Sequence, residues 1–301
     1  MFGGAYAGLG KLNMWQRVVI IGVGLIGGSI ARAIKKNALS RVVIGCGRDK
    51  EQLQLAQDLG VIDAFDQEIA HAVRAADLVI IAVPVGVMPA VFSALATVKD
   101  LHAVITDVGS VKGSVLAAAQ AAFGALPPRF VAGHPIAGTE KSGVEASFAD
   151  LFVNRCAILT PTAQTDPQAL MAVAKLWRDL GAEVVEMEAT HHDEVLAATS
   201  HLPHVLAYTL VDTLAKMDER REIFRFAAGG FRDFTRIASS DPTMWRDICI
   251  ANREAIIAMI ERYQEELETL KNNIARSAQA DIEQQFTRAK QARDRFMKNF
   301  I

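Results

Sequence analysis

Residues 17–36 join an apolar, β-branched run (RVVIIG) to a glycine-rich turn and then to a run with helical spacing (LIGGSIARAIKK). The spacing Gly-x-Gly-x-x-Gly in the turn has chemical meaning only between a strand and a helix. There the first glycine permits a tight turn, the second lets a pyrophosphate approach the backbone and helix N-terminus, and the third allows helix–strand packing. We predict a dinucleotide site; the alternative is a turn used only for packing. The predicted contacts are Gly22, Gly24, Leu25, Ile26 and Gly27.

The rest of the first 188 residues repeats this alternation of strand and helix. Apolar runs such as RVVIGC, DLVIIAVP, HAVITDV, RFVAGHPI, CAILT and AEVVEM are separated by segments of helical spacing. Continuous apolar strands between helices are typical of a parallel sheet that is covered on both faces. We therefore predict an α/β Rossmann-type dinucleotide-binding domain over residues 15–188, preceded by a flexible extension over residues 1–14.

The remaining sequence has a different texture. After residue 188 no convincing β-run remains, and apolar residues recur at helical spacing. Ser240 or Asp241, followed by Pro242, marks one helix start. We predict an all-α substrate and dimerisation domain over residues 189–301. Its amphipathic helices, notably over residues 243–270, carry more apolar positions than one small helical layer can cover, so we expect an obligate homodimer.

Composition argues against several classes of protein. The formal net charge is −2 over 301 residues, without a block of like charges, so we expect no nucleic-acid partner and no membrane partner. The uncharged stretch between Asp77 and Lys99 is nominally long enough to span a bilayer, but Pro84, Gly86 and Pro89 interrupt it. The N-terminal segment lacks the apolar core of a signal peptide. We therefore expect a cytoplasmic protein.

No metal site is predicted. The three cysteines, Cys46, Cys156 and Cys249, are far apart and are expected to be reduced thiols. Four histidines gather at positions 191, 192, 201 and 204, but no cysteine or paired carboxylate lies at a supporting spacing. We expect His191 and His192 at a solvated helix start.

The end of the second apolar run bears on the choice of cofactor. Dinucleotide-binding domains that prefer NAD usually carry an acid there, which hydrogen-bonds the ribose 2′-hydroxyl. Here Gly47 occupies the expected position, with Arg48 beside it. We therefore predict a preference for NADP over NAD, with Arg48 contacting the 2′-phosphate. The alternative is that Asp49 takes the place of the acid, although Asp49 is equally suited to cap the next helix.

Two polar motifs follow apolar strands, DVGSVK (107–112) and GHPIAGTE (133–140). Ligands of open parallel sheets bind outside the carboxyl ends of the strands, so both motifs are candidate site segments. His134, between a glycine and a proline, is suited to take a proton near neutral pH. Ser110 is suited either to bind a ligand or to cap the following helix, and the motif alone slightly favours the cap.

A pair of arginines lies in the helical half. Arg232 and Arg236 are four residues apart and would share one face of a helix. Two guanidinium groups so placed can bind carboxylates bidentately. The alternative is surface arginines paired with Asp233 or Asp241.

Four motifs in this order, DVGSVK, GHPIAGTEKSG, SHLPH and FRDFTRIASSDPTMWRDI, resemble the prephenate/arogenate (cyclohexadienyl) dehydrogenase family of tyrosine biosynthesis. The resemblance covers Arg17 to at least Leu270. It implies oxidative decarboxylation of prephenate or arogenate, to 4-hydroxyphenylpyruvate or tyrosine, with hydride transfer to NAD or NADP. It also implies a Rossmann-type domain followed by a helical domain that forms an interlocked homodimer. The motifs do not distinguish prephenate from arogenate.

The resemblance also implies roles for single residues. His134 would hydrogen-bond the ring hydroxyl of the substrate and take its proton as the hydride leaves, after which loss of CO2 makes the ring aromatic without help from a metal. Ser110 would touch the same hydroxyl and help to place the nicotinamide, and Arg236 would bind a substrate carboxylate. Asp233 is expected to reach the active site across the dimer. The remaining predicted contacts are His201, His204, Arg232, Thr139 and Glu140 for the substrate, and Val83, Pro84 and Asp107 for the cofactor.

Two other classes of protein fit parts of the sequence. A β-hydroxyacid dehydrogenase or imine reductase also joins a Rossmann domain to a helical dimerising domain, but it does not explain GHPIAG or the paired arginines. A non-catalytic NADP-sensing protein would have no reason to combine Ser110, His134 and Arg236. We expect no fused mutase and no regulatory domain, so any feedback inhibition would act at the active site itself.

Overall fold

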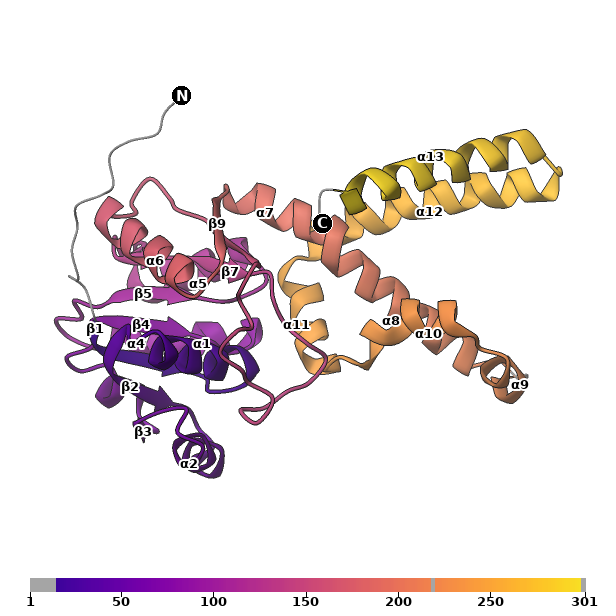
Figure 1. The fold of residues 1–301 in the computed structure, drawn as a ribbon. Helices are drawn as coiled ribbons and strands as arrows, with labels where there is room; N and C mark the ends of the chain where they lie inside the picture. Colours follow the sequence, from indigo (N-terminus) through magenta and orange to yellow (C-terminus); the bar gives the residue numbers. More distant parts are fainter. Residues whose placement is uncertain (1–14, 218–219, 299–301) are drawn as a thin grey trace. The chain divides into compact units, whose positions relative to one another are not determined.

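The computed structural model describes residues 15–217 and 220–298 (Figure 1). The predicted extension over residues 1–14 lies outside the described residues. Contacts divide the chain into two compact units, with the boundary between Arg253 and Glu254. The larger unit contains every strand of the described chain and the helices up to residue 251, and the smaller one is helical.

The larger unit is built on a sheet of six strands in the order β3-β2-β1-β4-β5-β6. All neighbouring strands pair in parallel. The winding reverses between β1 and β4, and such a switch point is where open α/β sheets bind ligands. The prediction of a parallel, Rossmann-type sheet is confirmed. The strands are β1 (Trp15–Ile21), β2 (Ser40–Cys46), β3 (Ala64–Asp66), β4 (Leu78–Ile81), β5 (Val104–Asp107) and β6 (Phe130–Val131).

Both faces of this sheet are buried, as the continuous apolar strands predict. Val18 and Ile20 of β1 belong to a core that α1 and α6 cover, whereas Val19 and Ile21 belong to a second core under α3, α4 and α5. Full burial of such a side chain contributes about 1.5–3 kcal/mol, which favours apolar residues at every position of the strand. The helices are α1 (Leu25–Lys36), α2 (Lys50–Asp58), α3 (Ile69–Ala72), the 3-10 helix η1 (Val85–Val87), α4 (Met88–Ala96), α5 (Lys112–Phe123) and α6 (Pro167–Asp179).

The chain leaves the first sheet at Ala132 and enters a second, smaller one. There β7 (Gly133–Pro135) pairs antiparallel with β8 (Cys156–Leu159), which pairs in parallel with β9 (Glu183–Glu186). The run RFVAGHPI, predicted as one strand with an exit loop, is therefore two strands in two sheets. Ala132 marks the change of partner, because its carbonyl accepts a hydrogen bond from the N–H of Thr160, the residue after β8. His134 consequently lies on a strand.

The rest of the larger unit is helical. α7 (Ala189–Leu196) continues through a π-helical turn, η2 (Ala197–His201), into α8 (Leu202–Ala215). The carboxylate of Asp241 accepts hydrogen bonds from the N–H groups of two first-turn residues of α11, so Asp241 and not Ser240 is its N-cap. The other helices here are α9 (Arg220–Arg225), α10 (Gly229–Thr235), the 3-10 helix η3 (Arg236–Ser239) and α11 (Pro242–Ala251).

The smaller unit consists of α12 (Arg253–Ala275), apart from its first residue, and the whole of α13 (Gln279–Lys298). Both helices carry exposed apolar side chains, such as Ile257, Leu267 and Phe286. Across residues 15–217 and 220–298, no helix combines the length and the apolar composition that a membrane crossing requires.

Candidate active site

The predicted cofactor and catalytic residues of the first domain gather along one edge of the six-stranded sheet. They follow the carboxyl ends of β1, β4 and β5, and the carboxyl ends of parallel neighbours share an edge. The edge includes Gly22, Gly24, Leu25, Ile26 and Gly27 after β1, Val83 and Pro84 after β4, and Asp107 and Ser110 at the end of β5.

The glycine-rich turn needs glycine at two positions and leaves space at a third. Gly22 has a φ of +96°, and a Cβ there would lie 2.4 Å from the carbonyl oxygen of Ala82. A Cβ on Gly27 would lie 2.0 Å from the carbonyl oxygen of Gly22, whereas a Cβ on Gly24 would meet no atom within 4 Å. Gly24 is the N-cap of α1, whose first turn has no side-chain cap and no acidic residue. The space over Gly24 and the uncapped N–H groups fit a phosphate.

Two charged residues after β2 have different roles: Asp49 caps a helix, and Arg48 is exposed. The side chain of Asp49 accepts a hydrogen bond of 3.1 Å from the N–H of Gln52 and so caps α2. Arg48 is exposed, and its guanidinium makes no hydrogen bond or ion pair within the described chain. The cap explains Asp49 without a ligand and leaves Arg48 as the available charged group beside Gly47.

A buried ion pair lies at the end of β5. The Nζ atom of Lys112 is 2.5 Å from Oδ2 of Asp107 and 2.6 Å from the carbonyl oxygen of Gly133, and both charged side chains are 0% exposed. Asp107 also accepts hydrogen bonds from the N–H groups of Gly109 and Gly133. Burial lowers the pKa of Lys112, and the attraction of Asp107 opposes this shift. Both carboxylate oxygens of Asp107, a predicted cofactor contact, are therefore engaged within the protein.

His134 is the first member of a chain of polar side chains. Its Nδ1 lies 2.9 Å from Nε2 of His192, whose Nδ1 lies 2.8 Å from Oδ1 of Asp193. His192 is completely buried, so its expected position at a solvated helix start is wrong. α7 packs against α5 and buries this face of the helix, so that of the two histidines only His191 is exposed.

Asp193 also decides the role of Ser110. Its two carboxylate oxygens accept hydrogen bonds of 2.8 Å from the N–H groups of Lys112 and Gly113, the first two residues of α5. The helix is therefore capped from α7, and Ser110 does not cap it. The Ser110 hydroxyl is half-buried and makes no hydrogen bond with another described residue, so it is available to a ligand.

The surroundings of His134 favour its neutral form. Burial is the largest cause, and unfavourable electrostatic interactions of a protonated ring with His192, Lys112 and His201 add to it, so that the pKa of His134 falls well below 6.5. A histidine that is neutral at neutral pH can accept a proton.

The predicted pocket histidines of the helical half lie around Trp245. His204 stacks on this ring, with centroids 3.6 Å apart, and His201 meets its edge at 6.1 Å. His201 is buried, which lowers its pKa to about 4, and its Nδ1 accepts a hydrogen bond of 3.1 Å from the amide nitrogen of Asn252. Nε2 of His201 therefore carries the proton, and it is buried without a partner among the described residues. An unpaired buried donor of this kind suits a polar group of a ligand.

The predicted carboxylate-binding residues are exposed. Arg236 forms an ion pair with Glu140, which connects the segment after β7 to η3. α10 ends at Thr235 and Arg236 begins η3, so the two arginines do not share one continuous α-helix. Arg232 and Asp233 are exposed, and their side chains make no hydrogen bond or ion pair with another predicted site residue within the described chain. The remaining predicted residue, Thr139, is also exposed, and its hydroxyl accepts the N–H of Lys141.

The structure adds residues that the sequence interpretation did not assign. Lys112, His192, Asp193 and Asn252 all belong to the buried polar network behind His134. Lys112 lies within the DVGSVK motif and His192 within the histidine group, but nothing local marks either side chain as buried. Within the part of the chain that the structure describes, no three or more His, Cys, Asp or Glu side chains form a metal-binding group.

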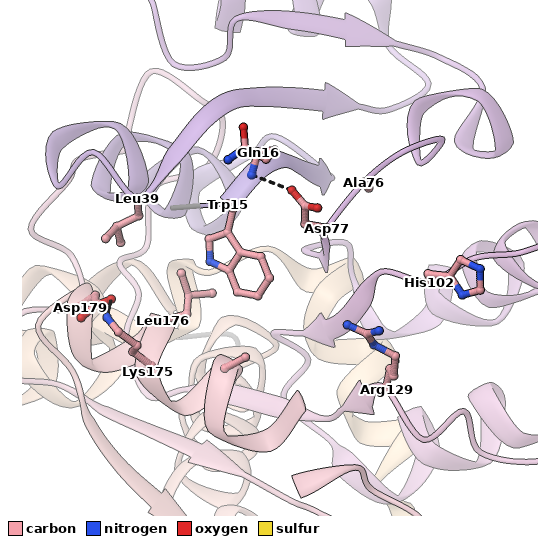
Figure 2. Close-up of a pocket in the computed structure, with 11 residues that line it drawn as sticks. Trp15, Gln16, Leu39, Ala76, Asp77, His102, Arg129, Lys175, Leu176 and Asp179 are labelled. Carbon is pink, nitrogen blue, oxygen red and sulfur yellow. Dashed lines mark hydrogen bonds and ion pairs between the residues drawn. The ribbon is translucent and has the colours of Figure 1, made fainter. Parts of the chain in front are cut away.

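A cavity of about 420 Å³ lies at the opposite, amino edge of the sheet (Figure 2). Trp15 begins β1 there, and the carboxylate of Asp77 accepts the N–H of Gln16. Ligands of this class of sheet bind at the carboxyl ends of the strands. This cavity is therefore not the candidate active site.

Comparisons with known proteins agree on one family. Residues 30–186 match the model of the prephenate dehydrogenase nucleotide-binding domain, and residues 188–289 match that of the prephenate dehydrogenase dimerization domain. A cyclohexadienyl dehydrogenase of Zymomonas mobilis is 39% identical over 88% of this chain and 90% of its own length. A prephenate dehydrogenase of Bacillus subtilis is 40% identical, over 94% of this chain and 76% of its own.

A solved structure gives the same result. The crystal structure of prephenate dehydrogenase from Aquifex aeolicus, in complex with hydroxyphenyl propionate and NAD+, superposes with a TM-score of 0.88 and is 40% identical in sequence. The match covers 94% of this chain and 98% of the other.

Proposed function

This chain belongs to the prephenate dehydrogenase family, and from that membership and the geometry of the site we propose that it oxidatively decarboxylates prephenate, arogenate or both. The products would be 4-hydroxyphenylpyruvate and tyrosine, and a nicotinamide cofactor would take the hydride. The observation that carries the proposal is a neutral His134 in a buried polar network, at the sheet edge that also holds the glycine-rich turn.

The residues of the site divide the chemistry between them. The nicotinamide, when bound, accepts the hydride. His134 accepts the proton of the ring hydroxyl, and the Ser110 hydroxyl is available to hydrogen-bond the same oxygen. Arg236 exchanges Glu140 for a carboxylate of the substrate. Because loss of CO2 makes the ring aromatic, positioning and one base are the main contributions that the protein must make.

The test is a steady-state assay with both substrates and both cofactors. We expect reduced nicotinamide to form together with CO2 when prephenate or arogenate is supplied. β-Hydroxy acids and cyclic imines, the substrates of the competing enzyme classes, should give no turnover. Turnover of those compounds without turnover of prephenate or arogenate would contradict the proposal. Binding of the cofactor without any hydride transfer would instead favour a non-catalytic NADP-sensing protein.

The proposed cofactor preference is for NADP. Gly47 provides no carboxylate that would repel a 2′-phosphate, Arg48 is available to bind one, and Asp49 is occupied as a helix cap. A charge-assisted contact of this kind contributes about 1.5–3 kcal/mol, or roughly 10–150-fold in preference. The Aquifex aeolicus structure contains NAD+, so this preference would distinguish the two proteins.

Two substitutions and a control test the preference. Gly47→Asp should shift the ratio of kcat/KM values toward NAD. Arg48→Ala should weaken the binding of NADP and leave the binding of NAD unchanged. Arg41→Ala, an exposed arginine near the start of β2, serves as the matched control. If the wild-type protein favours NAD and Arg48→Ala affects the binding of both cofactors equally, Asp49 and not Arg48 contacts the ribose.

The proposed assembly is a homodimer formed by the helical half. Residues 188–289 match a dimerization domain, and large apolar side chains are exposed in this half, including Phe226, Phe234, Ile250, Ile257, Leu267, Ile274 and Phe286. Sedimentation at micromolar concentration should give a dimer, and a monomer would also remove the proposed role of Asp233 across the interface. The domain boundary at residue 188 and the cytoplasmic location stay predictions.

A further inference from the structure

We propose that His192 and Asp193 are positioning residues that keep the proton of neutral His134 on Nδ1, so that Nε2 is the atom that accepts the substrate proton. The proposal rests on the proposed function for the role of His134. It assigns a purpose to two residues of α7 that have none in the reaction described above.

The direction of each hydrogen bond in this series of side chains follows from the groups that Asp193 contacts. Oδ1 of Asp193 accepts the N–H of Lys112 and Oδ2 accepts the N–H of Gly113, each at 2.8 Å. A carboxylate can only accept, so Nδ1 of His192, 2.8 Å from Oδ1, must donate. In neutral His192 the other ring nitrogen, Nε2, then carries the lone pair. It accepts from Nδ1 of His134 at 2.9 Å, which leaves Nε2 of His134 unprotonated.

The backbone of His134 is held by a separate set of contacts. The N–H of Gly133 is 3.1 Å from Oδ1 of Asp107, and its carbonyl is 2.6 Å from Nζ of Lys112. The buried ion pair therefore positions the main chain, whereas His192 positions the ring. Asn252, the residue that follows α11, holds α7 in turn, because its side-chain amide nitrogen donates to the carbonyl of Asp193 at 2.8 Å.

The charged and titratable groups around the ring agree with this arrangement. His192 of α7, Lys112 of α5 and His201 of η2 all disfavour a positive charge on His134, while the negative charge of Asp107 offsets that of Lys112. When the substrate proton arrives at Nε2, Nδ1 keeps its own proton and still donates to His192. No proton passes beyond His134, and Asp193 stays a carboxylate. Fixing the ring in advance avoids reorganisation during the reaction.

The experiment compares His192→Leu, which removes the acceptor, with His192→Gln, whose side-chain oxygen can still accept from His134. His191→Leu, an exposed neighbour on the same helix, is the matched control. Nitrogen-15 NMR of the histidine rings reports which nitrogen carries the proton, and the His134→Asn variant identifies the His134 signals. Steady-state kinetics gives kcat and KM separately.

We expect wild-type His134 to be protonated on Nδ1 at neutral pH. His192→Leu should move the proton to Nε2 and lower kcat by at least about tenfold, within the ~10²–10⁴ that a base contributes, with little change in KM. His192→Gln should keep the wild-type tautomer and most of kcat, and His191→Leu should change neither.

Either of two results would overturn the proposal. One is a wild-type His134 that is protonated on Nε2, a measurement that needs no variant to fold. The other is an equal loss of kcat in both His192 variants with an unchanged tautomer, which would indicate a packing role. Because the NMR measurement needs no substrate, a tautomer that shifts as expected in a protein inactive toward prephenate and arogenate would contradict the proposed function. The positioning of the His134 proton by His192 would still stand, but the role of Nε2 toward the substrate would not.

Discussion

The two ends of the candidate active site are built in different ways. Around His134, side chains from β5, α5 and α7, together with Asn252 after the end of α11, form a buried network of ion pairs and hydrogen bonds. Around Arg236, one ion pair with Glu140 lies near the surface, with 62% of the arginine side chain and 35% of the glutamate side chain exposed. Buried networks hold one geometry, whereas an exposed pair contributes at most about 1 kcal/mol and exchanges partners readily. The first end suits chemistry, and the second suits binding and release.

The largest effect is expected at the base itself. His134→Asn should lower kcat by about 10²–10⁴ while KM stays close to the wild-type value, because an amide can still hydrogen-bond the substrate hydroxyl but cannot take its proton. Steady-state kinetics with saturating cofactor measures both constants, and His191→Asn is the control. An unchanged kcat would remove His134 from the mechanism.

The next prediction concerns the contribution of the buried network to the free energy of unfolding. Lys112→Met should lower the free energy of unfolding by about 3–5 kcal/mol, because it leaves the carboxylate of Asp107 buried without its partner. Lys175→Met, which breaks an exposed pair with Asp179 on α6, should cost no more than about 1 kcal/mol. Urea denaturation measures both. Equal losses would mean that the two pairs are equally solvated.

At the exposed end, Arg236→Ala should chiefly raise KM and leave kcat nearly unchanged, because a carboxylate contact acts in the ground state and the transition state alike. The expected loss is about 1.5–3 kcal/mol, or roughly 10–150-fold in KM. Arg178→Ala, an exposed arginine on α6, is the control. A variant that lost kcat instead would show that the arginine end also contributes to the chemistry, and the contrast between the ends would fail.

The smallest effect is a pH dependence that should be nearly absent around neutrality. Because the pKa of His134 lies well below 6.5, the histidine is already neutral at pH 7, and kcat should stay level as the pH rises further. Acidification should lower kcat only when the pH falls through the depressed pKa, at which the base becomes protonated. A pH–rate profile measures this, and a kcat that still rises from about pH 6.5 to 8 would indicate an unperturbed histidine.

Much of the fold follows from short-range patterns. The β-branched runs of β1, β4 and β5 reveal strands buried on both sides, and Gly22, Gly24 and Gly27 mark the turn that follows the first of them. These signals are local, because strand burial, positive φ and helix capping depend on residues within one or two turns of the chain. The helix caps at Asp49 and Asp241 can be predicted from the sequence for the same reason.

The polar network behind His134 depends on contacts that no local pattern contains. Asp193 caps α5 across 81 residues of sequence, and His134 meets His192 across 58. The two histidines at 191 and 192 look alike in the sequence, yet one is exposed and the other is buried, because only the packing of α7 on α5 decides which face of the helix leaves water. Local physics selects the strands, turns and caps, but the burial of Lys112 and the partner of His134 arise only when distant segments pack together.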